Sequence, residues 1–327
     1  MAARATELKA MGRRVPAGWG PISRRSFLVG LAAAAGCVPG GTPSSSGELE
    51  LVWGRHGLTP GRFHKPRAIA IDREDRLYIV DMTARIQVFD REGSFLREWQ
   101  TPTHEFGRPT GMTVVDDRVL VADTHYFQVL IYSLTGQLRG KLGGQCGTGP
   151  GQFGLVTDVV RDPQGRYLIS EYGDFDRIQV LSPEGDYLFQ FGGQGDRPGE
   201  FLRPQSLAWD EAGMLWVADA CNHRVQQFAI GPNRAELVRC WGTHGMSPQQ
   251  LRYPYGIVAG PDRTVYVCEW GNARVQRWTE DGRVLGSFGR PGREPGALQQ
   301  PWSLVRDSRG RLSVLDSLNH RVQRIVL

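Results

Sequence analysis

The chain has 327 residues, with 39 Lys plus Arg against 34 Asp plus Glu, and its 42 Gly and 20 Pro indicate many turns rather than long helices. Residues 1–36 contain six of the basic residues and one of the acids, so residues 37–327 hold 33 charges of each sign and sum to zero. Nucleic-acid-binding domains normally carry a basic surface of their own, and the balanced charge therefore excludes a nucleic acid as the expected partner.

The leader carries two export motifs in order. Segment 23–28, with Arg24 and Arg25 at its centre, resembles a twin-arginine export signal, and the apolar segment 29–35 that follows is too short to span a bilayer as a permanent helix. It ends in Ala-Ala-Gly-Cys37, which resembles a lipobox, where the peptidase needs small residues and the cysteine is lipidated. The alternative is an N-terminal membrane anchor that is never cleaved.

These motifs predict three parts of the chain: a signal peptide with lipobox at 1–37, a flexible tether at 38–47, and a folded domain at 48–327. The protein is expected to be exported and lipid-anchored on the periplasmic side of a bacterial membrane. The choice between inner and outer membrane stays open, although Val38 after the cysteine favours the outer one.

From residue 48 onward one pattern recurs six times. Each unit contains a Gly/Pro turn, an aromatic residue or Leu, a short apolar strand, a second strand ending in an acid, a loop, and a third strand. The turn residue is Phe63, Phe106, Phe153, Phe201, Leu251 and Leu298. The acid is Asp81, Asp123, Glu171, Asp219, Glu269 and Asp316. The acids are 42 to 50 residues apart, an interval that suits four short strands and their turns.

The clearest copies are 215–226 and 314–323, which contain Asn-His-Arg-Val-Gln after the acid. They resemble the NHL repeat, and the resemblance covers 48–327. It implies an all-β fold, a six-bladed β-propeller of four-stranded blades. Only three strands follow the start of the last repeat, so we expect segment 48–53 to supply its fourth strand and close the ring.

Candidate ligand residues lie at one end of this ring. Six variable residues open the innermost strands, namely Arg67, Thr110, Thr157, Gln205, Tyr255 and Trp302. Further candidates in the loops after the second strands are the aromatic residues Tyr126, Tyr172 and Trp270. A specific site would show variation at equivalent positions, although unselected surface positions also vary. For Trp270, the alternative interpretation is packing against the next blade.

The acids and the following arginines form a recurring set that we interpret as scaffold. The pairs are Asp81–Arg85, Glu171–Arg177, Asp219–Arg224, Glu269–Arg274 and Asp316–Arg321. Repeat two departs, with Phe127 at the expected arginine position. His223 and His320 sit where the repeat favours His, which predicts hydrogen bonds in the loops rather than metal ligation.

No P-loop, nucleophile elbow, HExxH or paired CxxC motif occurs. Related propeller families offer two enzyme alternatives: an amidating-lyase-like zinc site built from His125, His223 and His320, and a lactonase-like site that needs inward Glu, Asn and Asp ligands for zinc or calcium. No cofactor is otherwise expected. The pairing of Cys146, Cys221, Cys240 and Cys268 stays open, because buried thiols and disulfides both fit.

The favoured function is therefore binding rather than catalysis. We expect an envelope lipoprotein, monomeric or part of a complex, that binds a protein, peptide or glycan through the loop end of the propeller. A metal-dependent lyase or hydrolase with its site at the axis is the alternative.

Overall fold

A computed structural model describes residues 46–106 and 108–327. The predicted export signal with Arg24 and Arg25, the lipobox with Cys37, and residues 38–45 of the predicted tether lie outside the described residues. The first strand of the fold begins at Glu48.

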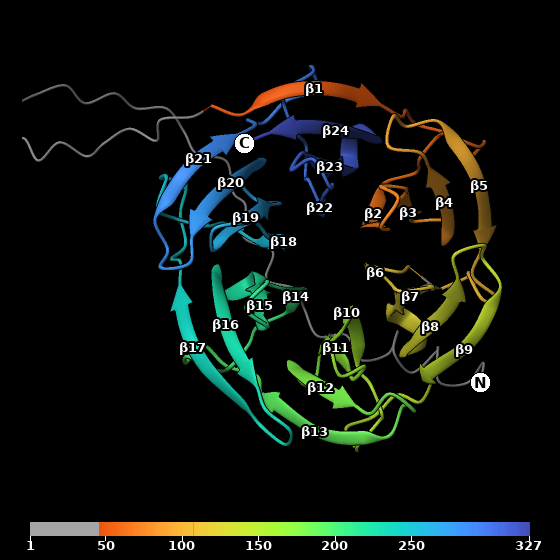
Figure 1. The fold of residues 1–327 in the computed structure, drawn as a ribbon, viewed down its shortest axis with the longest axis vertical. Coiled ribbons are helices and arrows are strands. Elements are labelled where there is room, and N and C mark those ends of the chain that lie inside the picture. Colours follow the sequence, from red (N-terminus) through yellow and green to blue (C-terminus); the bar gives the residue numbers. More distant parts are fainter. Residues whose placement is uncertain (1–45, 107) are drawn as a thin grey trace, which may run out of the picture. The chain divides into compact units, whose positions relative to one another are not determined.

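Six four-stranded antiparallel sheets stand around a common axis, which confirms the predicted propeller (Figure 1). Blade 1 is β2 (Pro66–Ile71), β3 (Leu77–Asp81), β4 (Arg85–Phe89) and β5 (Phe95–Gln100). Blade 2 is β6 (Gly111–Val115), β7 (Arg118–Asp123), β8 (Gln128–Ser133) and β9 (Leu138–Gly143). Blade 3 is β10 (Leu155–Arg161), β11 (Tyr167–Tyr172), β12 (Arg177–Leu181) and β13 (Tyr187–Gly192).

The second half repeats this plan. Blade 4 is β14 (Pro204–Trp209), β15 (Met214–Asp219), β16 (Arg224–Ile230) and β17 (Ala235–Trp241). Blade 5 is β18 (Pro254–Ala259), β19 (Thr264–Glu269), β20 (Arg274–Thr279) and β21 (Val284–Phe288). Blade 6 is β22 (Leu304–Arg306), β23 (Leu312–Asp316), β24 (Arg321–Val326) and β1 (Glu48–Trp53). The first strand of each blade lies nearest the axis and the fourth forms the rim.

The ring closes by pairing the two ends of the domain. Strand β1 runs antiparallel to β24, with Glu48 opposite Val326 and Trp53 opposite Val322. This pairing supplies the fourth strand of blade 6, as predicted. It also removes two open strand edges, which would otherwise be free to pair with another chain.

The repeating turn residue explains how neighbouring blades pack. Phe201 is fully buried, and a Cβ built on Gly192, whose φ is +86°, would collide with its ring. Only glycine leaves room there and adopts that backbone conformation without strain. The turn residues of five blades are fully buried, but Phe106 of blade 2 is 64% exposed, so the predicted equivalence fails at that position.

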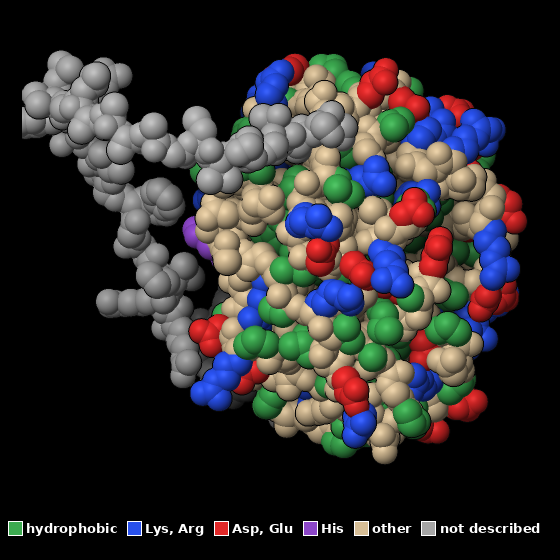
Figure 2. Space-filling model, turned by 60° about the vertical axis from the view of Figure 1, so that its left-hand side comes forward, with side chains coloured by type: hydrophobic (Ala, Val, Ile, Leu, Met, Phe, Trp, Pro, Cys, Tyr) green, Lys and Arg blue, Asp and Glu red, His purple; other side chains and the backbone are tan. Residues whose placement is uncertain are grey.

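Among the described residues, three 3₁₀ turns connect the second and third strands of blades 2, 4 and 6: η1 (Thr124–Tyr126), η2 (Ala220–Asn222) and η3 (Ser317–Asn319). Within the part of the chain that the structure describes, no helix is long and apolar enough to cross a bilayer. Figure 2 shows basic and acidic side chains interspersed over the face that it draws, in keeping with the balanced charge of 37–327.

Candidate functional site

Successive strands of each blade run in opposite directions. The connectors before the innermost strands and the loops between the second and third strands therefore meet at one end of the ring. We call this end the loop face. It carries all the predicted ligand residues, and a recurring set of polar contacts fixes its backbone.

In blade 4, the fully buried Asp219 accepts a hydrogen bond from Arg224 Nε at 2.8 Å. The same carboxylate accepts the backbone N–H of Leu202 at 2.8 Å and the side-chain amide of Asn222 at 2.9 Å. Arg224 also donates to three carbonyl oxygens in connector 196–200. One buried ion pair thus attaches the loop to the connector.

The other four predicted acid–arginine pairs form as well. Their nitrogen–oxygen distances are 3.3 Å for Asp81–Arg85, 2.7 Å for Glu171–Arg177, 2.5 Å for Glu269–Arg274 and 2.7 Å for Asp316–Arg321. All five acids are fully buried, and each is supplied with a charged partner, as a buried charge requires. These pairs are scaffold, as the sequence predicted.

Blade 2 departs from this pattern, but not at the predicted residue. Phe127 follows η1 with φ +55°, in the left-handed position that His223 occupies after η2. Gln128 stands opposite Asp123 in the sheet, as arginine stands opposite the acid in blade 4. Gln128 is five residues after Asp123, as Arg224 is five residues after Asp219, so Gln128 takes the arginine position in blade 2. The prediction that placed Phe127 there is wrong by one residue.

Gln128 Nε2 donates to Asp123 Oδ2 at 3.0 Å, while Oδ1 is buried and accepts no hydrogen bond from the described residues. Burial without a cationic partner raises the pKa of Asp123 to about 6. Blade 2 is thus the place where the scaffold lacks its counterion.

His223 and His320 each hold two blades together. The Nδ1 atom of His223 accepts the backbone N–H of Tyr253, and that of His320 accepts the N–H of Lys65, both at 3.0 Å. Tyr253 and Lys65 have left-handed backbones, with φ of +50° and +49°. These contacts are the hydrogen bonds that the sequence predicted for the two histidines.

His125 lies elsewhere in its loop, two residues after the acid and inside η1. The charged neighbours of the three histidines also differ; they are Arg67 and Arg108 for His125, His244 and Arg252 for His223, and His56 and His64 for His320. Across residues 46–106 and 108–327, no group of three or more His, Cys, Asp or Glu is arranged to hold a metal ion. The zinc alternative finds no ligand set here.

Four predicted ligand residues meet a fifth side chain at the channel mouth. The Arg203 Cζ atom lies 4.6 Å from the ring centroid of Tyr172 and 5.2 Å from that of Tyr255. Tyr255 meets Trp302 edge to face, with centroids 4.9 Å apart. The Arg67 Cζ atom lies 4.5 Å from the Trp302 ring. We call these five residues, which come from five different blades, the arginine–aromatic chain.

Trp270 extends this chain sideways. Its ring stacks on Tyr255 with centroids 5.7 Å apart, and it meets Tyr253 edge to face at 5.8 Å. Both of these tyrosines belong to the blade of Trp270 itself. Cation–aromatic and aromatic–aromatic contacts of this kind hold the mouth side chains in defined orientations.

The other predicted ligand residues have internal partners. Thr157 is fully buried and its Oγ1 bonds Ser170 Oγ at 2.8 Å, while Thr110 Oγ1 donates to the Thr157 carbonyl at 3.1 Å. Gln205 is buried and accepts a hydrogen bond from Arg203 Nε at 2.9 Å. The Tyr126 hydroxyl accepts the backbone N–H of Phe106 in its own connector at 3.1 Å.

The sequence missed Arg203 and Arg108. Arg203 directly precedes Pro204, the first residue of β14, and Arg108 directly precedes Pro109, two residues before β6. In the sequence, each therefore looks like a residue of the connector between blades. Arg203 has φ +59°, and its backbone N–H donates to Asp176 Oδ1 at 2.7 Å. The position before this proline could have identified Arg203 as a candidate, because the equivalent residue of blade 5 is Tyr253, which also lies at the mouth.

Behind the mouth lies a central channel of about 280 Å³, lined by the innermost strands of all six blades. Among the described residues, Asp158 is the one carboxylate that lines it. Asp158 Oδ1 accepts the N–H of Val159 and Oδ2 the N–H of Leu207, both at 2.9 Å. Burial raises the pKa of Asp158 to about 7.

The cysteines add no chemistry to this channel. Cys221 and Cys240 are exposed thiols, and Cys268 is a buried thiol whose pKa burial raises well above its usual value. A raised pKa leaves little thiolate at neutral pH, and the thiolate is the reactive form.

Comparisons with known proteins agree on the fold. A family model described as the SMP-30/Gluconolactonase/LRE-like region matches residues 68–298. The NHL repeat-containing protein 3 of Homo sapiens is 32% identical over 197 residues, which cover 55% of this chain and 56% of that protein. Protein brain tumor of Drosophila melanogaster is 26% identical over 148 residues, covering 45% of this chain and 13% of that protein. The chain spans about half the length of the NHL repeat-containing relative that it matches.

Two solved structures share the architecture at low identity. One, provisionally described as a gluconolactonase, is 14% identical with a TM-score of 0.62, covering 87% of this chain and 93% of that one. The other is virginiamycin B lyase from Staphylococcus aureus, 13% identical with a TM-score of 0.55, covering 81% and 95%. At these identities the likeness is one of fold alone.

Proposed function

The chain belongs to the SMP-30/gluconolactonase/LRE-like family, and on that premise we propose that it is a binding propeller that holds a partner protein against its loop face. The observation that carries the proposal is the arginine–aromatic chain, five side chains from five blades around one channel mouth. A few residues carry most of the binding energy at protein interfaces, and these residues are enriched in tryptophan, tyrosine and arginine. The likeness to NHL repeat-containing proteins supports the same assignment.

The proposal includes a location outside the cytoplasm. The twin-arginine motif and the lipobox support export and lipidation at Cys37. Mass spectrometry of the protein purified from its native membrane tests this part, because cleavage and lipidation change the mass of the N-terminal peptide. A Cys37→Ala variant that stays equally membrane-bound would contradict the lipid anchor and favour the uncleaved leader.

A lactonase-like or lyase-like activity is the second candidate, and one observation favours it: a buried carboxylate with a pKa near 7 lines the channel. Such a pKa suits a general acid or base. A metal ion does not fit this channel, however, because Asp158 is its single carboxylate among the described residues and both carboxylate oxygens already accept backbone N–H groups.

Site-specific photocrosslinking tests the binding proposal. A photoreactive residue at Tyr253, next to the arginine–aromatic chain on the loop face, is expected to capture one specific partner in intact cells, and one at Leu188, an exposed residue of the outer strand β13, is not. The captured partner is then purified and titrated against the propeller. Tyr255→Ala/Trp302→Ala is expected to weaken binding at least tenfold, whereas Leu188→Ala/Val238→Ala on the rim leaves it unchanged. Equal loss in both variants, or in neither, contradicts the loop face as the binding surface.

A further inference from the structure

Three arginines at the channel mouth lack an ion-pair partner among the described residues. Arg67, Arg108 and Arg203 form no salt bridge there. Burial lowers the pKa of Arg67, and the nearby charges of Arg108 and Arg203 lower it further. Asp176, the carboxylate beside Arg203, already accepts the Arg203 backbone N–H and a hydrogen bond from Gln194.

The buried arginines of the scaffold behave differently. In five blades the arginine of the third strand is paired with a buried carboxylate, at 2.5 to 3.3 Å. At the mouth, by contrast, the half-buried Arg67 and Arg203 and the exposed Arg108 have no carboxylate paired with them among the described residues. Like charges gathered without a counterion destabilise the folded state unless an anion joins them.

Two hydrogen-bond donors at the mouth are also unused. Arg67 Nε and Trp302 Nε1 are buried and donate to no described atom. Stacking of the Arg67 guanidinium over the Trp302 ring fixes its plane and leaves its N–H edge for an acceptor in that plane. Buried donors are normally satisfied, so this arrangement indicates an acceptor that the protein does not itself supply.

We propose that Arg67, Arg108 and Arg203 form a binding site for a single oxyanion, a carboxylate or phosphate group carried by a segment of the partner protein. This proposal rests on the binding function proposed above and names the chemistry that the mouth recognises. Arginine binds both oxyanions through paired N–H groups. The zero net charge of 37–327 and the mixed charges in Figure 2 fit a single anionic group better than an extended polyanion.

Small probes test the site without knowledge of the partner. Benzoate, phenyl phosphate and uncharged benzamide are titrated against the propeller by ligand-observed NMR at low and high salt. We expect benzoate or phenyl phosphate to bind and benzamide not to bind, and the stronger of the two anions identifies a carboxylate or a phosphate as the natural group. The proposal would be overturned if benzamide bound as tightly as both anions. It would also be overturned if neither benzoate nor phenyl phosphate bound.

Matched variants separate the site from general charge effects. Arg67→Gln and Arg203→Gln are each expected to weaken binding of the anionic probe at least tenfold, whereas Arg263→Gln, an exposed arginine whose side chain is 76% accessible, leaves it unchanged. Circular dichroism and thermal melts establish that each variant is folded. If Arg67→Gln does not fold, Arg67→Lys retains the charge but not the planar fork, and an unchanged affinity in that variant counts against the proposal.

The partner itself distinguishes failure of this inference from failure of the binding function. If Tyr255→Ala/Trp302→Ala loses the crosslinked partner while Arg67→Gln/Arg203→Gln binds it with full affinity, the loop face binds protein but not through an oxyanion. If both double variants keep full affinity, both proposals fail. Loss in both, together with loss of the anionic probe in the arginine variant, supports both.

Discussion

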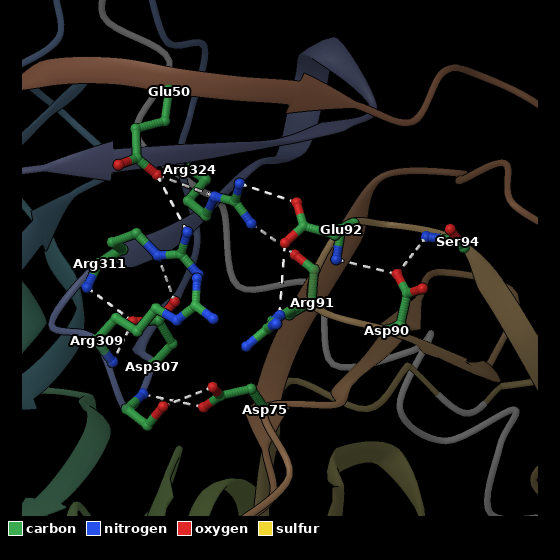
Figure 3. A network of polar contacts seen from close by, with 11 residues as sticks. Glu50, Asp75, Asp90, Arg91, Glu92, Ser94, Asp307, Arg309, Arg311 and Arg324 are labelled. Atoms are coloured by element: carbon green, nitrogen blue, oxygen red, sulfur yellow. Dashed lines mark hydrogen bonds and ion pairs between the residues drawn. The ribbon is translucent and has the colours of Figure 1, made fainter.

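Arg324 Nε in β24 donates a hydrogen bond to Glu50 Oε2 in β1 at 3.1 Å, joining residues 274 positions apart. The same guanidinium donates to the Arg91 carbonyl at 2.8 Å and to Glu92 at 3.0 Å, both in the turn between β4 and β5 of blade 1 (Figure 3). One side chain therefore connects the first strand, the last strand and the neighbouring blade at the point where the ring closes.

Removing this guanidinium is expected to weaken ring closure. The Arg324 side chain is 10% exposed, so Arg324→Met leaves its acceptors unpaired and lowers the free energy of unfolding by about 1–3 kcal/mol. Glu50 is 32% exposed, and Glu50→Gln lowers it by only about 0–1 kcal/mol because water replaces the contact. Urea denaturation measures both. Arg73→Met, in an exposed pair with Asp116, serves as the control and changes stability by less than about 0.5 kcal/mol.

Blade 2 offers a gain of stability. Gln128→Arg places a guanidinium opposite Asp123, as in blade 4, and is expected to lower the pKa of Asp123 from about 6. The variant should be about 1 kcal/mol more stable than the parent at pH 7.5, where the carboxylate is charged. The gain should disappear at pH 5, where Asp123 is protonated in the parent. Chemical denaturation at the two pH values measures it, and an equal gain at pH 5 would show that the new side chain acts through packing alone.

The fold could be predicted because its information is local and repeated. Each unit shows the same acid at nearly the same interval, and a four-stranded blade follows from that interval. The acid–arginine pairs could also be predicted, since only a short loop separates the partners in sequence and the copies agree. Spacing also places Gln128, because Asp123 and Gln128 are five residues apart, as Asp219 and Arg224 are in blade 4.

The mouth was only partly predictable. Tyr255 and Trp302 stand out as large side chains at positions that face the axis, but Arg203 comes from a connector, and its place beside Tyr255 depends on the backbone turn fixed by Asp176. Thr157 varies between repeats as a ligand residue would, yet its hydroxyl is buried in contacts between strands. Variation at equivalent positions therefore does not distinguish a binding residue from a blade-specific packing residue.

The stability of the protein should depend on Asp158 in a direction unusual for a carboxyl group. Its pKa is about 7 in the folded state, against an ordinary value of 3.8, so the folded state binds the proton more tightly. The contribution of Asp158 is therefore most favourable below about pH 4 and is lost as the pH rises toward 7, at about 1.4 kcal/mol for each pH unit between those two values. Asp158→Asn removes this titration.

The free energy of unfolding is measured for the parent and for Asp158→Asn between pH 4.5 and 8. We expect the parent to lose stability relative to the variant as the pH rises, with the difference levelling off above about pH 7. The absolute effect of the substitution is not the test, because asparagine offers one acceptor to the N–H groups of Val159 and Leu207 where the carboxyl offers two. A difference that does not change with pH contradicts the raised pKa.

His223 should produce the opposite pH dependence. Burial, and then the charges of His244 and Arg252, lower the pKa of His223 to about 4, and its neutral Nδ1 accepts the N–H of Tyr253. Because the folded pKa lies below 6.5, the unfolded chain takes up the proton first, so the stability that His223 contributes is complete above about pH 6.5 and decreases as the pH falls toward 4. His223→Asn tests this, since asparagine tolerates the left-handed backbone and can accept the same N–H without titrating. Thermal melts from pH 7.5 to 4.5 should show a smaller acid-induced decrease in Tm for the variant than for the parent, and identical decreases would mean that the contact between blades 4 and 5 does not sense protonation.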